Sequence, residues 1–234
     1  MMQMRETLFV LLFILYFYLF FFEQTRHPYT VFFIGEPVLY KEGYENSNPI
    51  QEIVLLGDSI LDNQQYADKS LYYFLSNDKD NYNYNIVMLA RDNAVISNIY
   101  TQLSNGKIKN SPDTHIFLSV GGNNLLQLGE NPPDSKILAC FHEYKKLVEF
   151  ILARYNKCSL NLLNLYYPTS IYYKDKYNTI DKWNDLLASL SKKATIIEIS
   201  KVCYTNSDFV HMIEPSSNCS EKIASLIRFH SLRQ

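Results

Sequence analysis

Short apolar runs alternate with longer amphipathic segments along most of the chain after residue 50. Five of the apolar runs are short and rich in β-branched residues, as buried strands are, and they cover residues 53–56, 86–90, 115–120, 160–166 and 194–199. The segments between them place apolar residues three and four positions apart, which is typical of amphipathic helices. Helices are predicted at residues 69–75, 94–103, 135–155, 180–190 and 220–229, with a further one directly after Ser59. The alternation predicts an α/β fold whose helices cover both faces of a parallel sheet.

Right-handed crossovers limit such a sheet to a few doubly wound strand orders. We expect a three-layer α/β/α sandwich with a flavodoxin-like five-stranded parallel sheet in the order 2-1-3-4-5. In this order the winding reverses between the first and third strands, which opens a crevice at their carboxyl ends. Both strands end in small polar residues, with G-D-S at 57–59 and G-G-N-N at 121–124. The two breaks therefore face the same crevice.

The first 50 residues have a different character. Residues 8–22 are an uninterrupted apolar and aromatic run that would span about 22 Å as a helix, somewhat short of the roughly 30 Å hydrocarbon core. No small residues follow it as a signal-peptidase site would require, so an uncleaved membrane anchor is favoured over a removed signal. Its orientation stays open, because Arg5 and Arg26 flank it on opposite sides. The expected organisation is a hydrophobic segment at 1–24, a linker or edge segment at 25–50 and one domain at 51–234, in a membrane-associated or secretory-pathway protein.

Composition narrows the function classes. The 234 residues carry a net charge of −2 with both signs interspersed, which gives no basic surface for nucleic acid. The four cysteines, Cys140, Cys158, Cys203 and Cys219, show no C-x-x-C spacing, so a metal site is not expected. They could form two disulfides in any of three pairings, or stay as buried thiols in a reducing compartment.

The polar break after the first strand offers a nucleophile. Ser59 would need a neighbouring base, usually a histidine that a carboxylate orients. Asp208 and His211 supply that pair from one loop after the fifth strand. Asn123 offers an amide donor for an oxyanion, and backbone N–H groups near Ser59 add to it.

These motifs, in this order, resemble those of the SGNH (GDSL) hydrolase superfamily of esterases and lipases. The resemblance covers about residues 53–224 and implies ester hydrolysis without a metal or organic cofactor. It implies that Ser59 is the nucleophile, Asn123 an oxyanion donor, and Asp208 and His211 the rest of a catalytic triad. Flanking polar residues, Gly122, Asn124 and Asp62, are expected to line the site.

Two departures from the family pattern bear on the mechanism. The family has a glycine oxyanion donor after the second strand, and Asn93 takes its place here; asparagine tolerates the positive φ that this position requires. The family also often reads D-x-x-H-P, whereas residues 212–214 separate His211 from Pro215. Sliding the alignment places Glu214 at the histidine position; because a carboxylate is not an imidazole, His211 is retained as the base.

The sequence thus predicts a serine esterase that hydrolyses an O-acetyl sugar, a lipid or a related acyl ester through Ser59, His211 and Asp208. The Ser59 and Asn93 backbone N–H groups and the Asn123 amide would hold the oxyanion. The alternative is a catalytically silent SGNH-fold module that binds a glycan or lipid at a membrane, since some superfamily members have incomplete triads.

Overall fold

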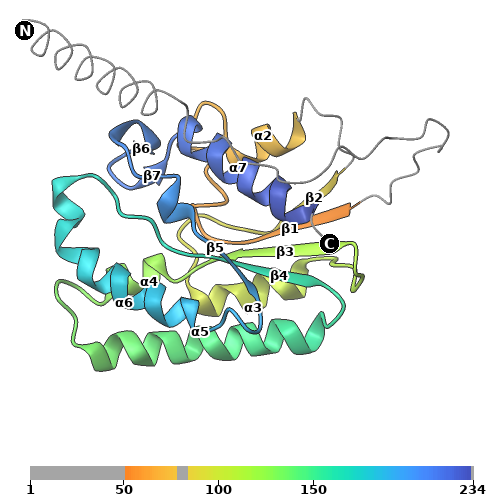
Figure 1. Cartoon of the computed structure of the whole chain (residues 1–234), viewed down its shortest axis with the longest axis horizontal. Coiled ribbons are helices and arrows are strands. Elements are labelled where there is room, and N and C mark those ends of the chain that lie inside the picture. Colours follow the sequence, from red (N-terminus) through yellow and green to blue (C-terminus); the bar gives the residue numbers. More distant parts are fainter. Residues whose placement is uncertain (1–50, 78–83, 233–234) are drawn as a thin grey trace, which may run out of the picture. The chain divides into compact units, whose positions relative to one another are not determined.

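The computed structural model describes residues 51–77 and 84–232, which form a five-stranded parallel sheet in the order β2-β1-β3-β4-β5 (Figure 1). The strands are β1 (Gln51–Gly57), β2 (Tyr84–Met88), β3 (Thr114–Ser119), β4 (Ser159–Leu163) and β5 (Thr195–Ile197). This is the predicted order 2-1-3-4-5. The expected anchor at residues 8–22 and the linker at 25–50 lie outside the described residues. No helix within the described ranges is long and apolar enough to cross a membrane.

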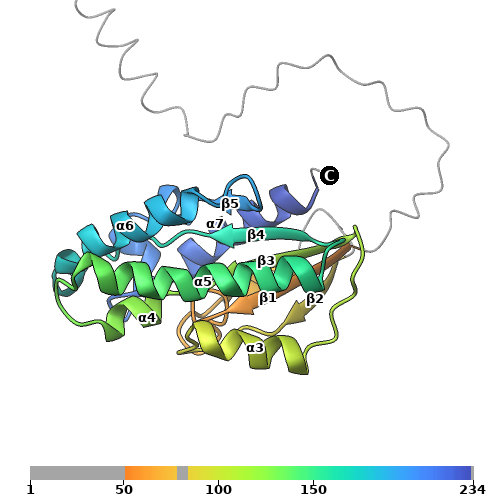
Figure 2. The same ribbon diagram turned by 90° about the horizontal axis from the view of Figure 1, so that it is seen from below.

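Helices cover both faces of the sheet (Figures 1 and 2). One face carries α2 (Leu71–Ser76) and α7 (Ser217–Ser231), which pack against each other. The other carries α3 (Ile96–Asn105), α5 (Asp134–Arg154) and α6 (Tyr177–Ala188), and the short helix α4 (Gly122–Gln127) starts directly after β3. The remaining helical elements are the 3₁₀ helices η1 (Ile171–Lys176), η2 (Ile199–Lys201) and η3 (Asn206–Asp208). The three-layer prediction is confirmed.

The sheet is buried on both faces, which explains why its strands read as continuous apolar runs rather than alternating ones. The inner strand β1 has no exposed surface from Ile53 to Leu56. Beneath the sheet, Trp183 of α6 packs edge-on against Phe141 and Tyr144 of α5. This aromatic cluster lies directly under the turn at Gly121, where a Cβ atom would collide with the Trp183 ring. Glycine is therefore required where β3 leads into the site.

The helix predicted directly after Ser59 is wrong. A single turn forms there, in which the Asp58 carbonyl accepts hydrogen bonds from the Leu61 and Asp62 N–H groups. The apolar side chains that suggested a helix, Ile60 and Leu61, are instead buried in the core. The chain becomes helical at α2, where the Ser70 hydroxyl caps the first turn.

A two-stranded antiparallel hairpin between η3 and α7 was not predicted. Its strands, β6 (Phe209–Val210) and β7 (Glu214–Pro215), pair Phe209 with Pro215 and Val210 with Glu214. The turn places His211 and Met212 at φ values of 46° and 71°. Non-glycine residues adopt such angles at a cost of about 1 kcal/mol or more each. The hairpin stores strain beside the residues that the sequence had marked as catalytic.

Relief of this strain should stabilise the fold. Met212→Gly is expected to raise the free energy of unfolding by about 1 kcal/mol, because glycine adopts positive φ freely and the half-exposed Met212 side chain loses little packing. Urea unfolding measures the change. Met88→Gly is the matched control, since in strand β2 glycine should destabilise. A Met212→Gly protein less stable than wild type would contradict the strained turn.

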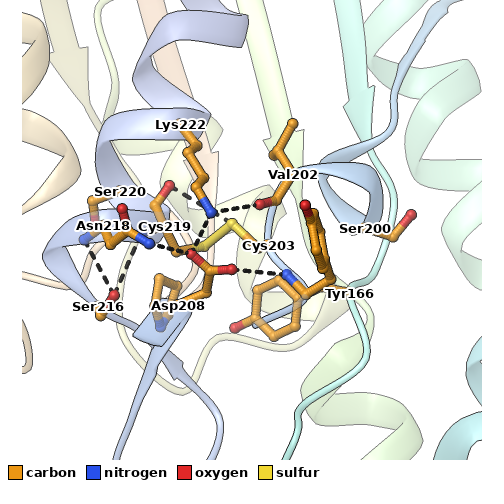
Figure 3. Close-up of a disulfide and its surroundings, with 12 residues drawn as sticks. Tyr166, Ser200, Val202, Cys203, Asp208, Ser216, Asn218, Cys219, Ser220 and Lys222 are labelled. Atoms are coloured by element: carbon orange, nitrogen blue, oxygen red, sulfur yellow. Dashed lines mark hydrogen bonds and ion pairs between the residues drawn. A yellow bond between two sulfur atoms is a disulfide. The ribbon is translucent and has the colours of Figure 1, made fainter. Parts of the chain in front are cut away.

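One disulfide joins Cys203 to Cys219, while Cys140 and Cys158 are free thiols. The sequence had left this point open among three pairings and a reduced state. The bond links the loop after η2 to the first turn of α7 (Figure 3). It closes a 16-residue separation around the hairpin, which restricts the unfolded chain and so stabilises the region that holds the candidate site.

Candidate active site

Ser59 lies two residues beyond the end of β1, in a turn that several backbone contacts fix. The Gln102 side chain of α3 pairs with Gly57 at both backbone groups: the Gly57 N–H donates to Oε1 at 3.0 Å, and Nε2 donates to the Gly57 carbonyl at 2.8 Å. The Asp58 N–H donates to the Ser119 carbonyl of β3 at 3.0 Å. A Cβ atom at Gly57 would collide with that same carbonyl, so β1 and β3 approach closely here only because residue 57 is glycine. The turn holding the serine is thus rigidly attached to the sheet.

Asp58 is a buried carboxyl group next to the serine. Its Oδ1 accepts hydrogen bonds from the Ile60 N–H at 3.2 Å and from the Ser119 hydroxyl at 3.3 Å. Burial raises the pKa of Asp58 to about 7, and the nearby Glu214 charge adds to the effect, while the two hydrogen bonds oppose it. The carboxyl therefore fixes the turn geometry, and near neutral pH it is partly protonated.

The expected oxyanion donors lie close to this turn. The Asn123 amide lies at the start of α4 and donates one hydrogen bond, 3.0 Å long, to the Ala94 carbonyl. An amide nitrogen carries two hydrogens, so its second donor remains for a ligand. Asn93 adopts a φ of 59°, the left-handed conformation expected of a glycine substitute. The contact between Asn123 and Ala94 ties the two oxyanion loops together.

Ser59, Gly122 and Asn123 line one pocket of about 80 Å³ at the carboxyl ends of β1 and β3. A largely apolar wall forms its sides, with members that include Ile60, Leu125, Leu165, Tyr166, Ile180 and Ile213. Asn93 lines a neighbouring polar groove instead. The other two residues expected to line the site, Asn124 and Asp62, do not line this pocket. They connect loops instead: Asn124 Oδ1 accepts from the Ile96 N–H at the start of α3, and Asp62 Oδ2 accepts from the Asp92 N–H.

Glu214, which the sequence interpretation had set aside as a base, lines the same pocket as Ser59. Its carboxyl is half-buried, and burial raises its pKa; an interaction with the Ser59 hydroxyl and the charge of His211 act in the opposite direction. The Oε2 atom is buried and has no hydrogen-bond partner among the described residues. The structure therefore brings Glu214 to the serine.

Distant contacts hold Glu214 in this position. The buried Asn63 side chain donates to the Pro215 carbonyl at 3.2 Å and to the Ser220 hydroxyl at 2.6 Å, so it joins the loop after Ser59 to β7 and α7. On the other side, the Tyr166 hydroxyl donates to the Ile213 carbonyl at 2.8 Å. The sequence suggested Asn63 only as a residue at the mouth of the crevice, beside Asp62, and it assigned Tyr166 no role in the site.

Asp208 lies away from the pocket, among groups that use both of its oxygens (Figure 3). Its Oδ1 accepts from Asn218 Nδ2 and Lys222 Nζ, each at 2.6 Å. Its Oδ2 accepts from the Tyr204 and Thr205 N–H groups and from the Thr205 hydroxyl. Burial alone would raise the pKa of Asp208, but the Lys222 and Thr205 hydrogen bonds outweigh it and lower the pKa. These contacts support a structural role for Asp208, which joins η3 to the first turns of α7.

Asp208→Asn is therefore expected to lower stability rather than turnover. Removing a buried carboxylate leaves the Lys222 cation without its partner, which should cost about 3 kcal/mol in the free energy of unfolding. Because the folded-state pKa is lowered, this loss should be present at neutral pH and should disappear as the pH falls below the ordinary value of 3.8.

Urea unfolding of Asp208→Asn, Lys222→Met and the double variant measures the coupling. The double variant should recover part of the loss. If Asp208→Asn unfolds like wild type and yet loses esterase turnover, Asp208 is the triad acid after all.

His211 is exposed at the hairpin turn, and it does not line the pocket. Its ring packs edge-on against Tyr66, with ring centroids 5.9 Å apart. The Tyr66 hydroxyl in turn donates to Asp92 at 2.7 Å. His211 is near enough to Glu214 for its charge to lower the pKa of that carboxyl. His211 is not among the hydrogen-bond partners of Asp208, which are Tyr204, Thr205, Asn218 and Lys222.

The sequence matches no protein-family model and no curated protein. Solved structures do share the fold. A member of the lipolytic G-D-S-L family from Veillonella parvula superposes with a TM-score of 0.62 at 17% identity, over 79% of this chain and 100% of that one. A lipase from a goat rumen metagenome superposes with a TM-score of 0.61 at 20% identity, over 76% of this chain and 96% of that one. Axe2, an acetylxylan esterase from Geobacillus stearothermophilus, superposes with a TM-score of 0.59 at 11% identity, over 79% of this chain and 95% of that one.

The chain therefore has the three-layer fold of the SGNH (GDSL) esterases and lipases, as the sequence motifs predicted. At these identities the likeness establishes the fold; the chemistry of the site has to be argued from its residues.

Proposed function

We propose that the chain is a serine hydrolase of the SGNH type that cleaves carboxylic esters. The observation that carries this proposal is that Ser59, Asn123 and Glu214 line one pocket at the switch point between β1 and β3. A nucleophile, a donor for a developing oxyanion and a proton acceptor are the groups that acyl transfer requires. The structural neighbours include a lipase and an acetylxylan esterase, which supports the same reaction class.

In this mechanism the Ser59 hydroxyl attacks the ester carbonyl and loses its proton to a neighbouring base. The negative charge that develops on the carbonyl oxygen is stabilised by the Ser59 backbone N–H group and the second Asn123 donor, since both residues line the pocket. The Asn93 backbone N–H, in the neighbouring groove, is the further donor that the family resemblance implies. Collapse of the tetrahedral intermediate expels the alcohol and leaves an acyl-enzyme. Water then attacks the acyl group and regenerates Ser59.

The pocket favours a short acyl group. Its volume of about 80 Å³ suits several heavy atoms, because a site for one water needs roughly 10–15 Å³ on the same measure. Its wall is mostly aliphatic and aromatic, which suits an alkyl chain. Lys176 also lines it, and its ammonium group donates a hydrogen bond to the Gly129 carbonyl. An O-acetyl sugar or another short-chain ester fits better than a long-chain lipid.

The base remains the open part of the proposed triad. His211 is the base that the family resemblance implies, and Asp208 its orienting acid. The hydrogen bonds of Asp208 support a structural role instead, and His211 packs against Tyr66 outside the pocket.

A silent binding module is the second candidate, and one observation favours it. The group that faces Ser59 is a carboxylate rather than an imidazole, which is the usual activator of a serine. Such a module would use the same apolar pocket to hold an acyl or glycan ligand without cleaving it.

Reaction with a fluorophosphonate probe separates the two candidates. Only an activated serine reacts, so the full chain should be labelled, and peptide mass spectrometry should locate the adduct on Ser59. A series of p-nitrophenyl esters from acetate to decanoate should show the highest kcat/KM for the shortest acyl groups. The absence of both labelling and hydrolysis would overturn the esterase and favour the binding module.

A further inference from the structure

We propose that Glu214, and not a histidine, takes the proton from Ser59. This proposal rests on the proposed function and adds to it the identity of the base. Glu214 is the acidic side chain of the β6–β7 hairpin, and it lines the pocket together with Ser59. Its carboxyl is close enough to the serine hydroxyl for that hydroxyl to lower its pKa. The catalytic pair would thus be serine and carboxylate.

Hydrogen bonds from two buried side chains hold the backbone on either side of Glu214. Asn63 fixes the backbone of the following residue, Pro215, and Tyr166 fixes that of the preceding residue, Ile213. Both anchoring side chains are buried and belong to the loops after β1 and β4. A base must stay within hydrogen-bond reach of the proton it removes, and these two contacts restrain the backbone on both sides of Glu214.

The two carboxylate oxygens have different surroundings. Oε2 is buried and has no hydrogen-bond partner in the described part of the chain, whereas Oε1 is not among the buried unpartnered atoms. A buried polar atom without a partner costs free energy, and in native structures it often marks a functional site. The unpartnered oxygen leaves this carboxyl free to accept a proton in the pocket that it shares with Ser59.

Glu214 alone can account for every proton transfer of the reaction. Its carboxylate accepts the Ser59 proton as the serine oxygen bonds to the ester carbon. The carboxylic acid then protonates the departing alkoxide, which leaves as the alcohol. In deacylation the carboxylate takes a proton from water as the hydroxide adds to the acyl carbon, and that proton returns to the Ser59 oxygen when the acid is released.

His211 acts on Glu214 from outside the pocket in this arrangement. Its positive charge lowers the pKa of the Glu214 carboxyl, so it opposes the burial that raises that pKa. His211 is therefore a positioning and electrostatic residue. Its strained backbone, with φ of 46°, is part of the turn that carries Glu214.

The pH dependence of turnover follows from Glu214 and the charged groups around it. These neighbours are Asp58, Asp92, His211 and Lys176, together with the Tyr66 and Tyr166 hydroxyls. Burial is the largest effect and holds the Glu214 pKa above its ordinary value of 4.5. A raised pKa makes the carboxylate a better proton acceptor, and kcat/KM should increase with pH as this group ionises.

The test compares Glu214→Gln with His211→Ala in the full chain. Glutamine keeps the size of the side chain but cannot accept the proton, so kcat/KM for p-nitrophenyl acetate should fall by about 10²–10⁴-fold, the usual contribution of a general base. His211→Ala should stay within about tenfold of wild type. Glu214→His supplies an imidazole at the same position and should restore activity over Gln, with the rise in kcat/KM moved to about pH 6.5.

The outcomes distinguish this proposal from the esterase proposal. If wild type reacts with the fluorophosphonate at Ser59 and Glu214→Gln reacts at the same rate, the esterase stands and Glu214 is not the base. If Glu214→Gln is inactive but Glu214→His keeps the wild-type pH profile, Glu214 only shapes the loop, and the proposal also fails. If wild type shows no reaction at Ser59, both proposals fail. Repeating the profiles in an Asp58→Asn background removes the titration of the second carboxyl.

Discussion

Ser59→Ala is expected to lower kcat/KM for p-nitrophenyl acetate by at least about 10³-fold and to abolish fluorophosphonate labelling. The change removes only the hydroxyl that attacks the carbonyl, so no acyl-enzyme can form. Some hydrolysis should persist, because the oxyanion donors and the pocket still bind the ester and a water can attack directly. Combination with Glu214→Gln should add little, since the two residues act as a unit and their losses are not additive.

The fold should survive this substitution. The turn that carries Ser59 is held by hydrogen bonds of the Gly57 and Asp58 backbone groups. The Ser59 side chain takes no part in these bonds. Circular dichroism and the unfolding midpoint should match wild type. Ser189→Ala, in an exposed serine after α6, is the matched control and should keep full labelling. Equal hydrolysis by wild type and Ser59→Ala would rule out Ser59 as the nucleophile.

The architecture was predictable because the signals for it are local and strong. Each of the five strands is an apolar run, and β1, buried throughout its centre, is the clearest of them. Two polar breaks at the ends of β1 and β3 predicted the position of the pocket, because the order of the sheet brings those ends together. The positive φ of Asn93 was predictable for a similar reason, since it depends on the conformational range of one residue.

The position of Glu214, the proposed base, was not predictable because it depends on contacts far apart in the sequence. Asn63 reaches the Pro215 carbonyl across 152 residues, and Tyr166 reaches Ile213 across 47. The hairpin itself has two-residue strands and a turn at His211 and Met212 without glycine, so no turn motif announced it.

One local signal did point away from Asp208. Thr205 and Asp208 form a capping box around η3, a short-range pattern that engages the aspartate with its own backbone. The same three-residue spacing between Asp208 and His211 fitted a catalytic pair equally well by sequence. Geometry separates the two interpretations, because the carboxylate oxygens that bind Thr205, Asn218 and Lys222 are those that would have to orient the imidazole.

Asp58→Asn is expected to stabilise the protein at neutral and alkaline pH. In the folded chain the Asp58 carboxyl is buried, and burial raises its pKa from 3.8 to about 7. Asparagine resembles the protonated acid: its carbonyl oxygen can still accept from the Ile60 N–H and the Ser119 hydroxyl, and it carries no charge. The substitution removes the free-energy penalty of ionising a buried group.

The sign follows from proton uptake. Between pH 3.8 and about 7 the unfolded chain has lost the Asp58 proton while the folded chain retains it, so stability falls as the pH rises. Above about pH 7 the folded chain ionises as well, and the penalty is complete. The rise of the Asp58 pKa from 3.8 to about 7, at about 1.36 kcal/mol per pH unit, gives a free-energy penalty for ionising buried Asp58 of up to about 4 kcal/mol.

The difference in unfolding free energy between Asp58→Asn and wild type should therefore be small near pH 4, grow by about 1.4 kcal/mol per pH unit, and level off above pH 7. Urea titrations at half-unit intervals of pH measure this curve. Asp185→Asn, which removes an exposed carboxylate on α6, should show a difference that barely changes over the same range. A difference for Asp58→Asn that is equally flat would mean that Asp58 is already ionised beside Ser59 at low pH. Asp58 and Glu214 would then both be ionised in the pocket. Repulsion between the two carboxylates, rather than burial, would then be the main cause of the raised pKa of Glu214.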